Sequence, residues 1–232
     1  LIGLVGSEMC IRDSFDTEKI SAKSLSYSLR AKAVLCPGLK IKFKNEISGD
    51  KEEWCFVDGL GDYLSTELGE GTYVPGEPII GEFSDDETAL SWAVIWERGD
   101  RESISESYVN LIPTMQGGTH VSGMRTGITD AIKEFCDYRK LLPKGVKLTP
   151  DDVWKNCSYI LSAKLKDPQF TGQTKEKLSS KDFQNIATSI TKDSFSIWLN
   201  QETQAAEEIA FLCIENAQAR ARASQKVERK KI

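Results

Sequence analysis

The sequence predicts an α+β fold in which helices cover one mixed β-sheet. Stretches with the alternation of β-strands recur between residues 39 and 166, and amphipathic helical stretches lie between and after them. The chain has 232 residues, of which 40% are hydrophobic and 28% are charged, so it is long and apolar enough to bury a substantial core.

The first expected elements are a helix and a hairpin. A helix is predicted at residues 24–34, and Cys36-Pro37-Gly38 ends it. The apolar residues that share one face of this helix are Leu25, Leu29 and Ala33. Residues 39–44 alternate apolar side chains with lysine, as a half-buried strand does, and residues 53–57 are expected to pair with them across a polar turn.

Residues 60–113 are expected to form a helix, a loop and three strands. A short helix at 60–68 is followed by residues 69–78, which are predicted to be a loop because Gly, Pro and Glu are frequent there. Residues 79–83 and 88–97 are predicted to be antiparallel strands, and residues 102–113 a further strand. The strand at 88–97 is apolar on both faces, which predicts a central place in the sheet.

A helix at 122–140, a second helix start and a strand are expected next. The long helix follows a turn at Gly117-Gly118, and its apolar stripe comprises Met124, Ile128, Ala131, Ile132 and Phe135. The run Thr149-Pro150-Asp151-Asp152 combines a cap, a proline at the first helical position and acids in the first turn, which is typical of a helix start. Residues 157–166 are predicted to be a strand.

Two further helices are predicted, at 180–200 and 202–229. Their inward-facing residues are expected to be Phe183, Ile186, Ile190 and Ile197 in the first, and Ala206, Ile209 and Cys213 in the second. Beyond these positions the second helix loses its apolar stripe and becomes basic. No stop signal follows it, so we expect the chain to be part of a longer protein.

Composition narrows the possible classes of protein. The formal net charge of −5 argues against a nucleic-acid binder along its whole length, and no apolar run approaches the ~18 residues of a membrane span. The six cysteines form no Cys-x-x-Cys, and His120 is the only histidine, which argues against a structural zinc site. We expect reduced cysteines, a cytoplasmic location and no metal ligands. His120 is expected to be a hydrogen-bonded residue at a turn; the alternative, a general base, lacks a nearby nucleophile.

Residues 1–14 are treated separately from the fold. The run Met9-Cys-Ile-Arg-Asp-Ser14 looks like the translated end of a transposon used in sequencing libraries. A signal peptide would need a basic start and a longer apolar core. We therefore expect a leader that does not derive from the source gene.

The stretch from Asp167 to Ser180 is the main functional candidate. Its Asp-Pro and Thr-Gly pairs are turn formers, so it is predicted to be an ordered loop with Gln173 and Lys175 near the tip. A lysine ammonium suits a phosphate, and a glutamine amide can donate to a phosphate oxygen. The alternative is a solvated loop without a ligand.

This loop and three other runs resemble the B subunit of bacterial type IIA topoisomerases, and the topoisomerase IV branch more than the gyrase branch. The resemblance extends from Phe15 to Lys231. The other runs are LRAKAVLCPG at 29–38, YVNLIPTMQGGTH at 108–120 and LPKGVK at 142–147. The resemblance implies that residues 15–58 end a GHKL-type ATPase domain, that 59–200 form a transducer domain, and that 201–232 lead towards a DNA-cleavage (TOPRIM) domain. It also implies a ribosomal-protein-like transducer fold with a left-handed βαβ crossover, where the general rule would give a right-handed one.

The resemblance also implies roles for individual residues. Gln173 and Lys175 would contact the γ-phosphate of ATP, with Lys175 as the catalytic residue. Arg125, expected on a solvated helix face, would line the cavity that receives the transported DNA; the alternative is a surface arginine or a salt bridge with Asp130 or Glu134. The basic residues of the last helix would either contact DNA or be solvated, and these are Arg220, Arg222 and Lys226.

For the whole protein, the resemblance implies an ATP- and Mg²⁺-dependent enzyme that passes one DNA duplex through another. Its partners would be duplex DNA, the A subunit in an A2B2 assembly, and a second copy of the B subunit, which would bind through the ATPase domains. The main ATP and metal ligands would precede residue 15, so this segment alone is expected to be inactive. The alternatives are the B subunit of gyrase, or a free-standing, non-catalytic DNA-binding or scaffold protein.

Overall fold

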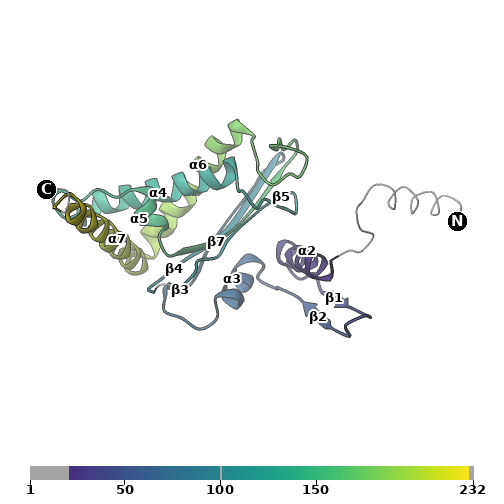
Figure 1. Ribbon diagram of the computed structural model, residues 1–232. Helices are drawn as coiled ribbons and strands as arrows, with labels where there is room; N and C mark the ends of the chain where they lie inside the picture. Colours follow the sequence, from purple (N-terminus) through teal and green to yellow (C-terminus); the bar gives the residue numbers. More distant parts are fainter. Residues whose placement is uncertain (1–20, 100, 230–232) are drawn as a thin grey trace, which may run out of the picture. The chain divides into compact units, whose positions relative to one another are not determined.

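The computed structural model describes residues 21–99 and 101–229, with side chains described as far as residue 223. The chain divides after Gly59 into two compact units (Figure 1). The expected leader at residues 1–14 lies outside the described residues. The assignment of the two units to named domains stays a prediction.

The described part of the first unit, residues 21–59, contains one helix and one hairpin. Helix α2 (Ala22–Leu35) begins at Ser21, whose hydroxyl accepts a hydrogen bond from the Ser24 amide at 3.3 Å. Strands β1 (Ile41–Lys44) and β2 (Lys51–Trp54) pair antiparallel. The second strand lies earlier than the predicted 53–57, because the chain leaves the hairpin after Trp54 and the carbonyl of Phe56 instead accepts from the Gly38 amide at 2.9 Å.

The second unit is built on the mixed sheet that the sequence predicts. Its strands are β3 (Tyr73–Ser84), β4 (Thr88–Glu97), β5 (Ser105–Val109), β6 (Ile112–Pro113) and β7 (Cys157–Leu165). They are ordered β3-β4-β7-β5-β6. The β5–β7 pair is parallel and the other pairs are antiparallel. Strand β4 lies between β3 and β7, as its two apolar faces predict.

Two strand predictions are corrected. The loop expected at 69–78 is wrong from residue 73 onward, because β3 begins at Tyr73. This edge strand accommodates Pro75, Gly76 and Pro78 through a shift of register between Val74 and Ile79. The single strand expected at 102–113 is divided by a tight turn. Asn110 and Leu111 both have positive φ, of 49° and 65°, so that Val109 pairs directly with Ile112.

Helices cover both faces of the sheet (Figure 1). They are α3 (Leu60–Leu68), α4 (Thr119–Arg139), α5 (Pro150–Trp154), α6 (Lys181–Gln201) and α7 (Thr203–Arg229). On one face, Leu90, Trp92, Val94 and Trp96 of β4 join the core that α4, α6 and α7 cover. On the opposite face, α3 packs against β3, β4 and β7. The α+β prediction is therefore confirmed.

The contact between α4 and α6 explains a wrong prediction about α6. A Cβ atom at Gly123 would lie only 2.6 Å from the carbonyl oxygen of Gln184, so the two backbones approach closely. Small side chains are needed where the backbones cross, and Ala187 and Thr191 lie there, opposite Gly123 and Gly127. The buried face of α6 that includes them is Phe183, Ala187, Thr191, Phe195 and Leu199. Ile186 and Ile197, expected to point inward, are 43% and 59% exposed.

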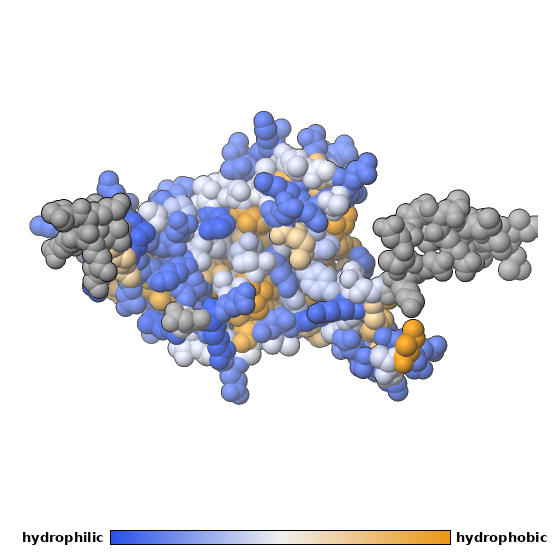
Figure 2. All heavy atoms as spheres, viewed as in Figure 1, coloured by the Kyte–Doolittle hydropathy of each residue, from blue (hydrophilic) through white to orange (hydrophobic). Residues whose placement is uncertain are grey.

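On the face seen in Figure 2, the described surface is mostly hydrophilic, with a hydrophobic area near its middle. Two apolar residues of the edge strand β3, Ile80 and Phe83, are only partly covered. In the part of the chain that the structure describes, every helix is too short or too polar to span a membrane.

Candidate functional site

The loop between β7 and α6 is a short hairpin. Phe170 and Leu178 form an antiparallel bridge, and the Thr171 amide donates to the carbonyl of Lys177 at 2.9 Å. Below this bridge, the Ser179 amide donates to the carbonyl of Gln169 at 2.8 Å. These bonds set a narrow base and leave residues 172–176 at the tip. The sequence predicted an ordered loop here, and the structure agrees.

Gln173 and Lys175 both lie at this tip and are exposed to solvent. Lys175 has a φ of +57°, an unusual conformation for a residue other than glycine. Its ammonium nitrogen lies 5.8 Å from the centroid of the Phe170 ring, within reach of a cation–π interaction. The tip therefore presents a lysine ammonium and a glutamine amide on a backbone whose base is fixed.

The base of the loop is joined to the start of α4. The Leu178 amide donates to the carbonyl of Gly117 at 3.0 Å, and the Thr119 amide donates to the carbonyl of Leu178 at 3.1 Å. The Leu178 side chain is buried in the main core. Nearer the tip, Gln116 holds Glu176 through a backbone bond of 3.0 Å and a side-chain bond of 2.7 Å. The loop base is thus joined by hydrogen bonds to the start of α4 and by the Leu178 side chain to the core.

Gly118 makes this junction possible. Its φ is +137°, and a Cβ atom there would lie 2.5 Å from the amide nitrogen of Leu178 and 2.8 Å from its Cα. Only glycine allows this backbone conformation and this approach. The sequence predicted a turn at Gly117-Gly118, but the partner of Gly118 lies 60 positions further on, and no local pattern indicated it.

Beside the loop base lies a groove of about 660 Å³. The first turns of α4, the strand β5 and the loop base form its wall, and its cations are Arg125, Lys177 and Lys181. Among the described residues that line it there is no aspartate or glutamate. The groove is therefore polar and locally basic in a chain whose net charge is negative.

Arg125 is half-buried in this groove rather than solvated as expected. Its guanidinium carbon lies 5.2 Å from the centroid of the Trp154 ring, so the aromatic face holds the side chain. The Trp154 indole in turn donates to the carbonyl of Arg125 at 3.2 Å and to the Thr129 hydroxyl at 3.1 Å. The alternative partner Glu134 pairs with Lys192 at 2.6 Å.

A buried hydrogen-bond network lies behind the groove. The Thr114 hydroxyl donates to the carbonyl of Ser107 at 2.9 Å and lies 3.1 Å from Nε2 of His120. Burial lowers the pKa of His120 to about 4, so its imidazole is neutral at physiological pH. The predicted hydrogen bond of His120 is confirmed, but the residue lies in the first turn of α4 rather than in the turn before the helix.

This histidine makes the stability of the fold depend on pH. Its pKa is lowered from 6.5 to about 4 in the folded chain, so the unfolded chain takes up a proton first as the pH falls. The free energy of unfolding should therefore drop by about 2 kcal/mol between pH 7 and pH 5 through this residue alone. Urea denaturation of the chain and of His120→Asn at both pH values measures this drop. An equal drop in the variant would contradict the assignment.

The basic residues of the last helix are placed differently from one another. The guanidinium of Arg220 binds the carboxylate of Asp152 on α5. Arg222 is exposed. The side chain of Lys226 lies outside the described part of the chain. Among described residues, no group of three or more histidine, cysteine, aspartate or glutamate side chains gathers as a metal site would.

A comparison with protein families decides the affiliation of the chain. Residues 44–229 match the family model described as DNA gyrase B. The chain belongs to the DNA gyrase B family. This confirms the resemblance to the B subunits of type IIA topoisomerases, which rests on the loop and the three runs above.

Within the DNA gyrase B family, the chain is similar to proteins named for topoisomerase IV. It is 51% identical over 218 residues to the B subunit of DNA topoisomerase 4 from Escherichia coli and 52% identical to that of Haemophilus influenzae. These matches cover 94% of the chain but only 35% and 34% of those proteins. The chain thus spans about a third of the length of the curated relatives that it matches.

Solved structures agree with this family. The topoisomerase IV ATP-binding domain of Francisella tularensis, solved with a small-molecule inhibitor, has a TM-score of 0.75 and 43% identity, and the match covers 90% of this chain and 57% of that one. The 43K ATPase domain of Thermus thermophilus gyrase B has a TM-score of 0.78 at 22% identity over 93% and 58% of the two chains. The second likeness concerns the fold alone.

Proposed function

We propose that this chain is the part of a topoisomerase IV B subunit that couples ATP binding and hydrolysis to clamp closure and the passage of duplex DNA. One observation carries the proposal: the exposed Lys175 stands at the tip of a loop whose base is bonded to the start of α4 and buried in the core. The names of the relatives, at 51% and 52% identity, support the topoisomerase IV branch over gyrase.

In this proposal, Lys175 and Gln173 read the γ-phosphate of ATP. The ammonium stabilises negative charge that develops as the phosphate is transferred, and the amide donates to a phosphate oxygen. The contact exists with ATP and is lost with ADP, so the position of the loop depends on the bound nucleotide. Mg²⁺ and the remaining ATP ligands would come from residues that precede this segment in the parent protein.

The groove beside the loop is the proposed DNA contact. Arg125 is held over Trp154 and faces a space without acidic side chains among its described residues. This is a suitable environment for a backbone phosphate of the transported duplex. The proposed protein partners are the A subunit of the assembly and a second copy of the B subunit. The proposed location is the cytoplasm, where cysteines stay reduced.

The nucleotide dependence of the loop tests this proposal. Amide hydrogen exchange would be measured on the full-length subunit with a non-hydrolysable ATP analogue and with ADP. We expect residues 171–177 to exchange more slowly with the analogue than with ADP. The turn at residues 143–145, which has no proposed role, is the internal control. Equal exchange of residues 171–177 in both nucleotides would reject the proposed function.

A further inference from the structure

Arg220 occupies a position on α7 where the helical pattern calls for an apolar residue. The buried stripe of α7 runs through Ile209, Cys213 and Ala217, with side chains that are 0%, 0% and 1% exposed. The next position on the same face is Arg220, three residues further on. The Arg220 side chain is 46% exposed, so it can reach a partner at the edge of the surface against which the helix packs while part of it stays in water.

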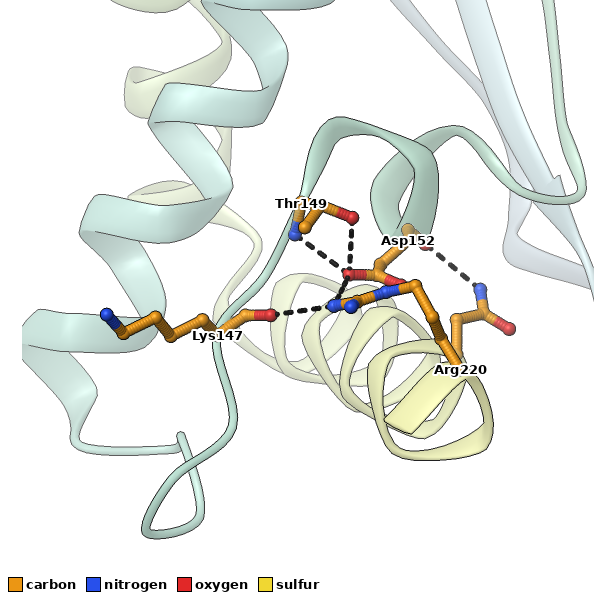
Figure 3. Close-up of polar contacts among 5 residues, drawn as sticks. Lys147, Thr149, Asp152 and Arg220 are labelled. Carbon is orange, nitrogen blue, oxygen red and sulfur yellow. Dashed lines mark hydrogen bonds and ion pairs between the residues drawn. The ribbon is translucent and has the colours of Figure 1, made fainter. Parts of the chain in front are cut away.

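That partner is Asp152 on α5, and the contact is a two-point fork (Figure 3). Nε of Arg220 donates to Oδ1 of Asp152 at 2.8 Å, and Nη2 donates to Oδ2 at 2.8 Å. The same Nη2 also donates to the carbonyl of Lys147 at 3.1 Å. The planar guanidinium matches a carboxylate in this geometry, which a lysine ammonium cannot reproduce.

Asp152 is itself fixed in place. Its side chain is only 3% exposed, and Oδ2 accepts from the Thr149 amide at 2.8 Å and from the Thr149 hydroxyl at 2.7 Å. Burial pushes the pKa of Asp152 upward, but the hydrogen bonds from Arg220 and Thr149 outweigh it and leave the pKa below its ordinary value. Asn216 of α7 donates to the backbone carbonyl of Asp152 at 3.0 Å. The sequence explained Asp152 only as an acid at a helix start.

The first turns of α7 are also tied to the same unit. Arg139, at the end of α4, donates to Glu207 at 3.2 Å and to the Thr203 hydroxyl at 3.3 Å. Between this contact and the Arg220 fork, the apolar stripe of α7 is buried in the core. Helix α7 is therefore fastened to the sheet unit along residues 203–220, and among the described side chains the fork is the last of these contacts before residues 221–223, which are exposed and include Arg222.

We infer that the Arg220–Asp152 fork is a positioning contact that makes α7 move together with the sheet of the second unit. This inference rests on the proposed function, because the movement it transmits begins at the nucleotide-sensing loop. Without the fork, the end of α7 separates from α5. A movement of the sheet then changes the gap between α5 and α7 instead of moving the end of α7. Arg220 then acts within the protein, whereas a DNA contact remains the prediction for Arg222 and Lys226.

The fork itself is tested on the chain alone, without nucleotide or DNA. In Arg220→Gln and in Asp152→Asn, amides of residues 215–223 are expected to exchange about tenfold faster than in the unchanged chain. Arg222→Gln, two residues away and with the same change of charge as Arg220→Gln, should leave that exchange unchanged. Unchanged exchange in Arg220→Gln, or an equal increase in Arg222→Gln, would overturn the inference.

The transmission is tested in the full-length subunit in complex with its partner subunit. Both fork variants should lower the number of duplexes passed per ATP hydrolysed by about fivefold, and the double variant should be no worse than either single variant. Lys192→Gln, which breaks the exposed ion pair with Glu134 and does not touch α7, is the control. Because Asp152→Asn and Arg220→Gln change the charge in opposite directions, a shared defect cannot come from a DNA contact of Arg220.

The outcomes separate this inference from the proposed function. The transmitting role of the fork would be overturned if the fork variants show faster amide exchange in residues 215–223 but pass as many duplexes per ATP hydrolysed as the unchanged protein. Lack of ATP-dependent passage in the unchanged protein would reject the proposed function instead, and the exchange result on the chain would still decide whether the fork holds α7.

Discussion

Replacement of Lys175 by alanine in the full-length subunit is expected to slow ATP turnover by about 100- to 1000-fold. This is the usual cost of removing a donor that stabilises charge in a transition state, ~2.7–4 kcal/mol. The effect should fall on kcat more than on KM, because the contact strengthens as charge develops on the γ-phosphate. Thermal stability should change little, since the side chain is exposed at the tip of the loop.

Lys177→Ala is the matched control for this substitution. It removes the same charge from the same loop, two residues away, from another exposed side chain. Measured without DNA, its turnover should stay within about twofold of the unchanged subunit. Similar losses in both variants would mean that the loop contributes only a general positive potential. An unchanged rate in Lys175→Ala would remove the residue from the catalytic assignment.

Replacement of Gly118 by alanine is expected to lower the free energy of unfolding by about 3 kcal/mol or more. Two costs combine: a φ of +137° that an L-residue rarely adopts, and a Cβ atom that would overlap the backbone of Leu178. The strain is relieved if the loop base separates from α4, so the variant should also lose ATP turnover in the full-length subunit. Urea denaturation and turnover measure the two effects.

Gly145→Ala separates the two costs. Gly145 also has a positive φ, of +83°, but no atom lies within 4 Å of the Cβ position. It should therefore lose only the conformational term, about 1–2 kcal/mol, and keep its turnover. If Gly118→Ala is no less stable than Gly145→Ala, the loop is not held to α4 in the way that the backbone geometry indicates.

The α+β fold and most of its elements followed from periodicity in the sequence. The two apolar faces of Thr88–Glu97 correctly indicated a strand inside the sheet, and the stripe from Met124 to Phe135 correctly indicated the buried face of α4. Capping signals placed the start of α5 at Pro150. These patterns are local, because burial of one face imposes a period of two on a strand and of 3.6 on a helix.

The failures arose where packing overruled the local pattern. The face of α6 was chosen by the close approach of α4, which admits Ala187 and Thr191 and leaves the larger Ile186 and Ile197 outside. Strand β3 passes through a Gly- and Pro-containing stretch because an edge strand has a partner on one side only. Neither fact can be read from a window of neighbouring residues.

For the candidate site, the sequence by itself determined the loop and the identities of its tip residues, since turn formers and a lysine are properties of the stretch itself. Only the tertiary structure decided how that stretch is fixed and which residues it depends on. Gly118 meets Leu178, and Arg220 meets Asp152, which lies 68 positions earlier. Such pairs form only when distant segments fold against one another. The role of a charged or small residue therefore cannot be inferred until its partner in the fold is known.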